Sequence, residues 1–520
     1  MHEVVTLQFG QQANYVGTHF WNTQESYFTY GSDEESPVDH DIHFRPGIGA
    51  NGSETYTPRT LIYDLKGAFG TLRRENALYE LQDDPTEISQ QMWSGSTNVI
   101  RNEAIPQSAY QQHLDQGLPT PALDTPNVRF WSDYNRVFYN PRSIVQLHEF
   151  ELNSALMPFE SWTTGEDLFN NLDREHDLLD RDLRRFLEEC DQMQGIQIMT
   201  RTDDAWGGFT AKYLERIRDD LGKASTWVFG LEEGGRRSRA KQMLQTANSA
   251  QSIYNIAQQA SLYIPITSTP SQLPSYVTID GTSKWHTAAL QVLAIESLTL
   301  PTRLRSNQAG RTSFGDIENV LSNDGNRRIA ALSMSLEDPT VHDVATNSAD
   351  GQNGSNGHSN GSVAEDGEPS VDKLDIDLYP EVAGSSDRSS ASSKSHVFSQ
   401  LQSLRGKWLS TFEIDDTNFA SRNRFSNAPK MERYQTSLLF PMLDSYPRIF
   451  AFSRPAYEKI AVRAALSTST VVSHRVRRIE GLARSLVGID EREALCDGLI
   501  SICEEYEDGW DSDSEIDDDA

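Results

Sequence analysis

The chain has 520 residues, 37% of them hydrophobic, and a formal net charge of −30. This length suits about two or three domains with a normal buried core. The acidic balance argues against nucleic acid or anionic lipid as a direct partner, because both are negatively charged. Ten acidic and no basic residues occur in 504–520. Such a tail is typical of a disordered solubilising segment; the alternatives are docking of a basic partner, or phosphorylation at Ser512 and Ser514.

Cysteine usage and hydropathy limit the cellular setting. Cys190, Cys496 and Cys503 show no CxxC spacing, so neither a disulfide framework nor a zinc site is predicted and a reducing compartment is expected. No apolar run reaches the roughly 18 residues of a membrane-spanning helix. No Arg or Lys precedes Arg45, which argues against a secretory signal or a matrix presequence. If the protein acts at an organelle, we expect it to act from the cytosolic side.

The first predicted elements suit a phosphate group. Val4–Phe9 is a β-branched and apolar run, which is typical of a buried strand. Gly10–Asn14 is a small polar turn, and a helical pattern begins at Tyr15. A turn between a strand and a helix N-terminus presents backbone N–H groups to an anion, so this segment has the arrangement of a nucleotide phosphate site.

Strand-like and helix-like segments alternate up to about residue 230, which indicates α/β architecture with a mainly parallel sheet. Thr60–Leu65 predicts a second buried strand, and Val128–Leu147 is strand-like with a turn in its middle. One long amphipathic helix is predicted from Thr163 to Gly195. Ile196–Met199 then predicts another strand.

The second half begins as a helical block and is interrupted. Helices are predicted at Arg239–Leu262 and Ala288–Leu298, followed by a strand at Ile329–Leu336. Residues 338–395 are rich in Gly, Ser, Asn and Asp, a composition that cannot bury enough surface to fold. From Arg454 to Glu505 the pattern is mostly helical. It includes a basic cluster, interpreted as a solvated helix face or, alternatively, a site for an acidic partner: Arg475, Arg477 and Arg478.

Four segments resemble segments of tubulin, and they occur in the same order as in that family. The turn at residues 10–17 resembles the family pattern GQCGNQIG, matching at Gly10, Gln11, Asn14 and Gly17 but not at Gln12, Ala13 and Tyr15. Leu61–Leu65 resembles the strand ending VDLEP, and Leu187–Gln197 is similar to the segment before the glycine-rich phosphate loop. ANSAQSIYN resembles YNATLSVHQ, and this resemblance implies that Asn248 reads the guanine base.

A closer resemblance is to the Misato family, tubulin-like proteins of the cytosol and mitochondrion. It rests on Glu54–Arg59, Asp64–Gly67, Trp131–Asp133, Asn140–Ile144 and the run at 188–195. The long acidic and Ser/Gly insertions suggest a fungal member. The resemblance implies a tubulin-like α/β fold: an N-terminal nucleotide-binding-type parallel sheet with flanking helices, a second α+β domain and C-terminal helices.

The predicted domain boundaries follow from this fold. A tubulin-like N-terminal domain covers 1–235, and core helices with the start of the second domain cover 236–337. A disordered insertion covers 338–397. The rest of the second domain with the C-terminal helices covers 398–503, and the acidic tail covers 504–520.

The phosphate loop departs from the tubulin pattern. Tubulins use GGGTGSG, because glycines let backbone N–H groups point at the anion. The equivalent stretch is Thr202–Gly208, which keeps only the last glycine clearly and introduces Asp203 and Asp204 where phosphates would lie. At ~4 Å and an effective dielectric near 20, each like-charge pair costs roughly 4 kcal/mol. A bridging Mg²⁺ is the alternative that would offset this cost.

The candidate nucleotide-binding residues are therefore vestigial, and no catalytic residue or metal site is predicted. They are Gly10, Gln11, Gln12, Asn14, Asp64, Lys66, Gly208 and Asn248. Lys66 replaces a tubulin acid and is either a phosphate contact or a surface lysine. The hydrolysis-promoting acid of tubulins has no clear match, with Asp324 the nearest candidate. His40 and His43 form either a metal pair or, as expected, part of a solvated loop.

Three hypotheses follow from the resemblance. The first is a non-catalytic tubulin-like protein of mitochondrial distribution, inheritance and mitochondrial DNA partitioning, without a cofactor. It would lie peripherally on the cytosolic face of the mitochondrion and in the cytoplasm. The second is a GTPase that binds GTP or GDP and turns over on self-association. The third is a cofactor of tubulin or of the cytosolic chaperonin in microtubule organisation.

Overall fold

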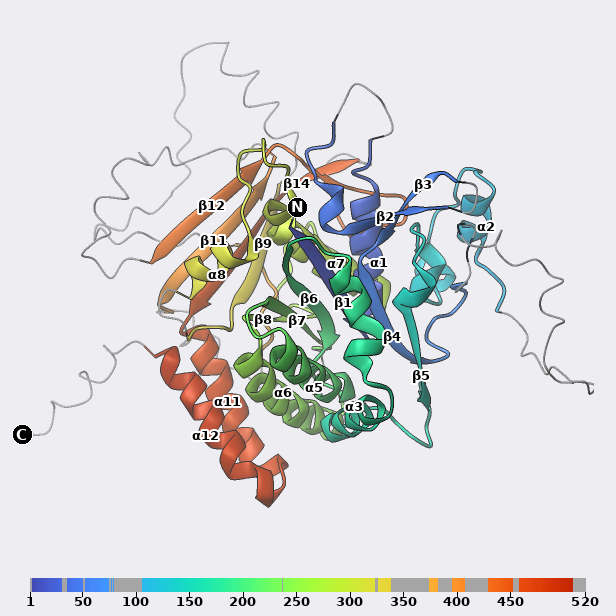
Figure 1. Cartoon of the computed structure of the whole chain (residues 1–520). Helices are drawn as coiled ribbons and strands as arrows, with labels where there is room; N and C mark the ends of the chain where they lie inside the picture. The colour runs from blue at the N-terminus through green and yellow to red at the C-terminus, as the bar shows by residue number, and fades with distance from the viewer. Residues whose placement is uncertain are drawn as a thin grey trace, which may run out of the picture.

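The computed structural model describes residues 2–29, 35–49, 52–73, 76, 78, 105–235, 237–322, 326–337, 374–381, 395–406, 429–451 and 458–507. Within these residues, two sheets enclose a long buried helix, and a helical hairpin follows at the C-terminal end (Figure 1).

The N-terminal part of the described chain is built on a six-stranded parallel sheet with the order β5-β4-β1-β6-β7-β8. In chain order this is 3-2-1-4-5-6, which reverses direction between β1 and β6. Ligands of such sheets bind at this reversal, outside the carboxyl ends of the strands. The strands are β1 (Glu3–Phe9), β4 (Thr60–Lys66), β5 (Ile144–Glu151), β6 (Met193–Arg201), β7 (Ser225–Glu232) and β8 (Leu262–Thr267).

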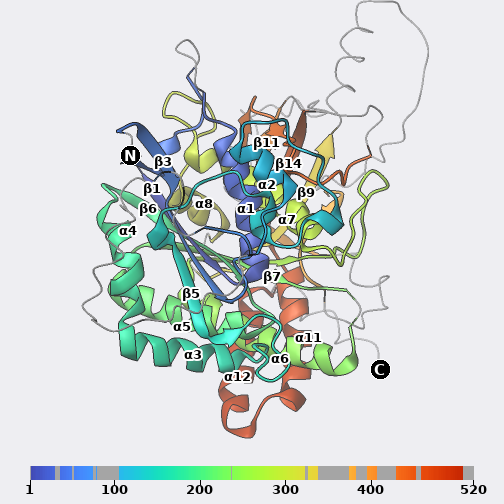
Figure 2. The same ribbon diagram turned by 90° about the vertical axis from the view of Figure 1, so that its right-hand side faces the viewer.

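Helices cover both faces of this sheet, because successive strand residues point to opposite sides and both sides are apolar. Val4 packs toward α1 and α7, whereas Val5 and Leu7 pack toward α3, α5 and α6. The views in Figures 1 and 2 agree on these layers. The helices are α1 (Gln11–Glu25), α3 (Trp162–His176), α5 (Ala205–Asp220), α6 (Arg239–Gln259) and α7 (Lys284–Thr299).

A second sheet of mixed direction packs on the far side of α7, with the order β10-β9-β14-β11-β12 and β13 paired to β14. Helix α7 is therefore buried between the two sheets, and its sequence is apolar around most of its circumference. The strands are β9 (Ala331–Glu337), β10 (Ile376–Asp377), β11 (Val397–Arg405), β12 (Lys430–Thr436), β13 (Phe440–Pro441) and β14 (Lys459–Ser469). Helix α8 (Phe314–Leu321) packs against β11.

A buried ion triad joins α7 to the second sheet. The Glu296 carboxylate accepts a hydrogen bond at 2.7 Å from Arg303 and is also bonded by the guanidinium of Arg405 on β11. All three side chains are fully buried. Arg405 also donates to the carbonyls of Leu438 and Leu439 at 3.0 and 2.9 Å, so most of its N–H groups are satisfied.

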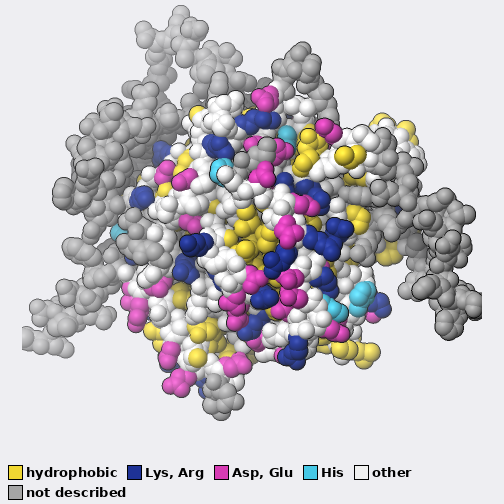
Figure 3. Space-filling model, in the orientation of Figure 1, with side chains coloured by type: hydrophobic (Ala, Val, Ile, Leu, Met, Phe, Trp, Pro, Cys, Tyr) yellow, Lys and Arg dark blue, Asp and Glu magenta, His cyan; other side chains and the backbone are white. Residues whose placement is uncertain are grey.

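A β-hairpin, a short helix and a C-terminal helical hairpin lie outside the two main sheets. The hairpin β2 (Phe44–Ile48) and β3 (Glu54–Pro58) and the helix α2 (Ala109–Asp115) lie near the α1 side. Helices α11 (Val471–Leu486) and α12 (Ile489–Glu505) form the C-terminal hairpin beside α6. Acidic and basic side chains are interspersed over the face shown in Figure 3, without a large patch of one sign.

The sequence predicted a solvated helix face for the basic cluster of α11. This prediction is wrong for one of its three arginines. Arg475 is buried and bonds Glu232 at the end of β7, with Nη2 at 2.6 and 2.8 Å from the two carboxylate oxygens. Arg477 and Arg478 are exposed. Helical periodicity explains the difference, because position 475 lies on the face of α11 that carries Val472 and Ile479.

Most predicted elements are confirmed, but the single helix from Thr163 to Gly195 is wrong. Helix α3 ends at His176, and Asp177 adopts the left-handed conformation with φ 45°. Such a residue ends a helix, and Asp tolerates it better than most side chains. A π-helical turn (Leu179–Leu183) and the short α4 (Arg184–Glu188) follow before β6.

The prediction of strand over Val128–Leu147 is also wrong for most of its length. Short 3₁₀ turns occupy Trp131–Tyr134 and Pro141–Ser143, and only β5 from Ile144 is extended. The buried carboxylate of Asp133 accepts the backbone N–H groups of Arg129 and Phe130 at 2.9 and 3.0 Å, which stabilises the turn.

Two further boundaries differ from the predictions. Residues 459–469 form β14 rather than helix, because this strand pairs on both sides with β9 and β11, and sheet context overrides local propensity. The predicted insertion over 338–397 contains a folded piece: β10 pairs with β9, and Leu374, Ile376 and Leu378 are buried. The remaining parts of that prediction, 338–373 and 382–394, lie outside the described residues, as does most of the acidic tail. None of the described helices combines the length and apolar character that crossing a membrane requires.

We predict that Arg405→Met destabilises the fold by about 3–5 kcal/mol, because it leaves the buried Glu296 charge with one partner fewer. The matched control is Arg184→Met, which removes an exposed ion pair with Asp180 and should leave the unfolding midpoint close to that of wild type. Urea unfolding midpoints of the three proteins test this. Equal midpoints for the two variants would contradict a structural role of the triad.

Candidate functional site

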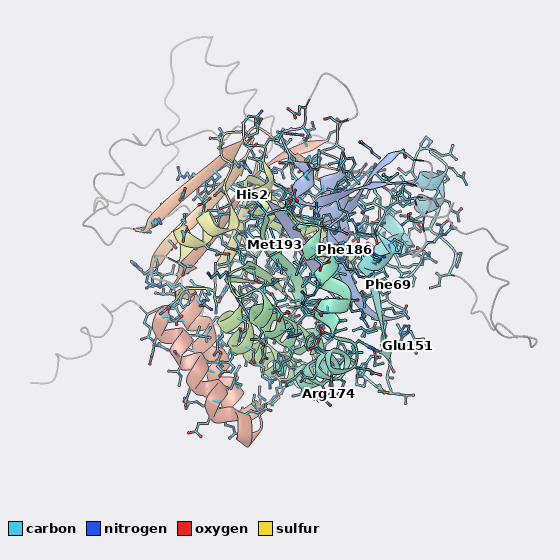
Figure 4. All side chains as sticks on the ribbon, in the orientation of Figure 1. His2, Phe69, Glu151, Arg174, Phe186 and Met193 are labelled. Atoms are coloured by element: carbon cyan, nitrogen blue, oxygen red, sulfur yellow. The ribbon has the colours of Figure 1, made fainter. Side chains whose placement is uncertain are left out.

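Two turns meet where the order of the parallel sheet reverses. One connects β1 to α1 at Gly10, and the other connects β6 to α5 through Thr202–Asp204. Both helices point their N-termini at the carboxyl edge of the sheet, as in phosphate sites. Figure 4 labels His2 and Met193 near the amino ends of β1 and β6, and Glu151 at the opposite edge, at the end of β5. The predicted strand–turn–helix order is confirmed, but the predicted turn over residues 10–14 is wrong: the turn is at Gly10, and α1 begins at Gln11 rather than at Tyr15.

The first turn is covered by an indole ring. Gly10 adopts φ 84°, a conformation that favours glycine, and its N–H bonds the carbonyl of Tyr63 at 2.9 Å. A Cβ atom at this position would overlap the ring of Trp206. The tryptophan thus lies directly against the backbone that a phosphate group would approach.

Trp206 is held in place by packing and capping. It is buried, and its ring contacts Phe159 and Phe209 edge-on, with centroids 5.2 and 5.5 Å apart. Its backbone N–H donates to the carboxylate of Asp204 at 2.9 Å, which caps α5. The positive end of this helix is therefore satisfied by a side chain of the same protein rather than by a phosphate.

The two aspartates of the loop share an arginine as their ion-pair partner. Arg201 Nε lies 2.6 Å from Asp203 and 3.3 Å from Asp204, and Arg201 Nη2 lies 2.8 Å from Glu233. Asp203 also accepts the backbone N–H of Glu233 and the Gln245 amide at 2.9 and 3.0 Å. Burial acts to raise the pKa of Glu233, but Arg201 and neighbouring cations outweigh it and lower the pKa to about 2. Arg201 thus offsets part of the repulsion predicted between the aspartates.

Asn14 and Asp64 form a buried pair beneath this turn. Asn14 Nδ2 donates to Asp64 at 2.7 Å, and the Leu65 N–H donates to the other carboxylate oxygen at 2.8 Å. Burial raises the pKa of Asp64 to about 7, although both hydrogen bonds act to lower it. Asn14 Oδ1 is buried without a hydrogen-bond partner among the described residues. A protonated Asp64 could donate to this oxygen after the Asn14 amide turned over.

The glutamines at the start of α1 join this helix to α7. Gln11 accepts a short hydrogen bond from Lys284 at the start of α7. Gln12 donates to Gln291 at 3.1 Å and to Thr287 at 3.4 Å. Both predicted binding side chains therefore fix the central helix against the sheet.

The remaining predicted residues have other roles. Asn248 on α6 donates to the carbonyls of Glu160 and Asp203 at 2.7 and 3.1 Å and accepts the Trp162 N–H at 3.0 Å, so its amide is fully used inside the protein. Gly208 lies within α5, and a Cβ there would overlap the Trp162 carbonyl of α3. Its role is close helix packing. Lys66 is exposed at the end of β4, which fits the surface alternative.

The space left at this edge is small. A cavity of about 50 Å³ lies between Gln12, Arg201, Glu232, Glu233 and Lys284. One water occupies about 30 Å³ of liquid, and small-molecule sites usually measure about 300–1,000 Å³. The cavity fits one or two waters and is too small for a nucleotide.

Comparison with known proteins also finds tubulin-like domains in this chain. Residues 2–116 match the Misato Segment II tubulin-like domain, and residues 120–304 match a tubulin domain. The chain is 47% identical to Protein DML1 of Phaeosphaeria nodorum and 49% identical to Protein dml1 of Aspergillus niger, over 100% of both chains in each case. It is 32% identical to Protein dml1 of Schizosaccharomyces pombe, over 62% of this chain and 70% of that protein. The chain belongs to the Misato (DML1) family of tubulin-like proteins.

Family membership and fold class were both predicted correctly. Three residues that decide the state of this Misato site were not predicted: Trp206, Arg201 and Lys284. One pattern could have indicated Trp206, because a bulky aromatic replaces a glycine of the tubulin loop. Arg201 directly precedes the loop, so its spacing of two and three residues from the aspartates could have indicated it. Lys284 reaches the site from the start of α7, which is distant in sequence, so no local pattern marks it.

The other candidates of the sequence do not form a second site. His43 is buried against Phe20 and Trp21, and His40 stacks on Phe28 with centroids 3.8 Å apart, so the prediction of a solvated loop is wrong. Burial lowers the pKa of His40 to about 4. No group of three or more His, Cys, Asp or Glu suited to a metal ion occurs in the described part of the chain. Asp324 lies outside it.

We predict that Asp64→Asn makes the fold more stable than wild type at neutral pH, because wild type must bury a charged Asp64 there. A carboxyl group whose pKa is raised from 3.8 in the unfolded chain to about 7 in the fold loses stability as the pH rises through that window. The Asn side chain keeps the Leu65 bond and can donate to Asn14 Oδ1. The advantage of the variant over wild type should therefore grow by about 3 kcal/mol from pH 5 to pH 8, at about 1.4 kcal/mol per unit.

Chemical unfolding at pH 5 and pH 8 measures this advantage. The control is Asp219→Asn, an exposed position on α5, which should show no comparable growth. A constant difference between Asp64→Asn and wild type at both pH values would contradict a protonated Asp64.

Proposed function

We propose that this Misato-family chain is a non-catalytic tubulin-like protein that acts in mitochondrial distribution and inheritance, including the partitioning of mitochondrial DNA. The observation that carries the non-catalytic part is Trp206, which lies on the Gly10 turn where a tubulin-like protein would hold phosphate. The mitochondrial part is supported by the family resemblance of the motifs at Glu54–Arg59 and Trp131–Asp133.

The chemistry of the site supports scaffold use rather than turnover. Hydrolysis needs a bound triphosphate, backbone donors aimed at it and a positioned water. Here the helix N-terminus at Asp204 is capped from within, and the Asn248 amide is saturated by protein groups. GTP or GDP as a cofactor is therefore the alternative that this geometry favours less.

The proposed location is the cytosolic face of the mitochondrion together with the cytoplasm. We infer a peripheral association, supported by the lack of a membrane-spanning helix among the described residues. The fold is tubulin-like, with two sheets around α7. This resemblance supports partners shared with tubulin, namely tubulin itself, the cytoskeleton and the cytosolic chaperonin. Action as a cofactor of tubulin or chaperonin in microtubule organisation is the second candidate function.

We predict that natively purified protein contains no stoichiometric GDP or GTP and that 1 mM GTP leaves its melting temperature unchanged. A nucleotide present at 100 times its Kd would stabilise the fold by about 2.7 kcal/mol, which a melting curve detects readily. Released small molecules are separated by chromatography beside Asn14→Ala. Stoichiometric guanine nucleotide in wild type that is lost in Asn14→Ala would overturn the non-catalytic proposal.

We predict that depleting the protein in its native cells clumps mitochondria and causes loss of mitochondrial DNA before the microtubule array changes. Imaging of mitochondria, mitochondrial nucleoids and microtubules over one time course measures the order of events. Wild-type chain should restore normal distribution, whereas Arg405→Met, which breaks the buried triad, should restore less. If microtubules fail first, the second candidate function replaces the first; if mitochondria stay normal throughout, the mitochondrial proposal is wrong.

A further inference from the structure

Helix α11 presents a basic surface on a strongly acidic protein. Its exposed residues recur every three or four positions, so they lie on one side of the helix. The side includes two arginines more than half exposed, Arg477 at 58% and Arg484 at 61%. We call this surface the α11 face; it consists of His474, Arg477, Arg478, Gly481, Leu482, Arg484 and Ser485.

On the α11 face, Arg484 pairs with Glu480 of the same helix, whereas Arg478 and Leu482 offer charge and apolar surface. No ion pair is recorded for Arg478 in the described part of the chain, and Leu482 is 40% exposed. Nothing lies within 4 Å of the position that a Cβ on Gly481 would take, so the backbone there is open to a bulky side chain. A basic stripe around a small apolar centre suits an acidic peptide that carries an aromatic residue.

The chain leaves α12 at one end of this face. Helix α12 runs antiparallel to α11, and Cys503 near its end donates to the Ser473 carbonyl at the start of α11. Tyr506 is buried, and its hydroxyl bonds both backbone groups of Ile329, which anchors this point. The next residue, Glu507, makes an ion pair with Arg477 of the α11 face. The last described residue before the tail is therefore in contact with this face.

We propose that the acidic tail, residues 508–520, docks on the α11 face of its own chain. The tail contains Asp508, Asp511, Asp513, Glu515 and three further aspartates, with no basic residue. Its two large apolar residues, Trp510 and Ile516, stand among these acids. The composition matches the face in both charge and apolar content.

The spacing permits this contact. Leu482 lies five residues beyond Arg477, about 7.5 Å along the helix at 1.5 Å per residue. Trp510 lies three residues beyond Glu507, and an extended chain of that length spans about 10 Å. The indole can therefore reach Gly481 and Leu482 while Asp511 and Asp513 approach Arg478 and Arg484. Attachment to the same chain gives the tail an effective concentration in the millimolar range, so modest contacts suffice.

Disulfide trapping in the full-length chain tests the proposal. Ser485→Cys combined with Ser512→Cys places one thiol on the α11 face and one in the tail; the spans are about 12 Å of helix and about 17 Å of extended chain. The matched control combines Ser512→Cys with Ser501→Cys, an exposed position on α12 that the tail can reach equally well. Native thiols interfere little, because burial raises the pKa of Cys190 and Cys503 to about 11 and Cys496 is buried.

Under mild oxidant, the Ser485/Ser512 pair should close about tenfold faster than the control pair, because docking raises its local concentration. Adding Arg478→Glu, or raising the salt to 1 M, should bring the rate to that of the control. Equal rates for the two pairs would overturn docking in cis and leave the face to an acidic partner protein. A fast rate that ignores Arg478→Glu would overturn the electrostatic basis of the proposal.

Discussion

The Glu296 carboxylate between Arg303 and Arg405 is the interaction on which the arrangement of the two sheets depends. A buried carboxylate is tolerated only when hydrogen bonds and opposite charges surround it. Its partners come from the turn after α7 and from β11. Gln24 of α1 and Tyr27, just after that helix, add hydrogen bonds at 3.3 and 2.9 Å. Moving any of these elements would leave a buried charge unpaired. The triad thus sets the position of α7, and α7 in turn holds Gln11 and Gln12 of the first turn.

This scaffold keeps the tubulin architecture while its phosphate region is filled from within. In a binding site, some polar groups and some space are left for the ligand. At this edge the groups are already used: Arg201 pairs with the loop aspartates, Asp204 caps α5, and Asn248 bonds three backbone groups. The space over Gly10 contains the Trp206 ring. Admitting a nucleotide would require breaking several of these interactions together.

Local patterns predicted the parts of the fold that short stretches determine. The strand at Val4–Phe9, the turn at Gly10 and the helices at 239–259 and 284–299 follow from hydrophobic runs and periodicity. The site itself depends on contacts between distant segments, such as Trp206 on Gly10, and these leave no local pattern. Strand β14 was missed because its pairing partners, not its composition, make it a strand. The piece around Ile376 was missed because it is short and flanked by low-complexity sequence.

The C-terminal hairpin connects the closed site to the protein surface. Arg475 points inward from α11 and bonds Glu232, which lines the small cavity beside Arg201. Arg477 and Arg478 point outward from the same helix. Under the proposed non-catalytic function, a change of state would come from a contact at the surface rather than from nucleotide. Helix α11 is suited to such a role. Its outer face is exposed, and its inner face holds Glu232 at the small cavity through the buried ion pair of Arg475.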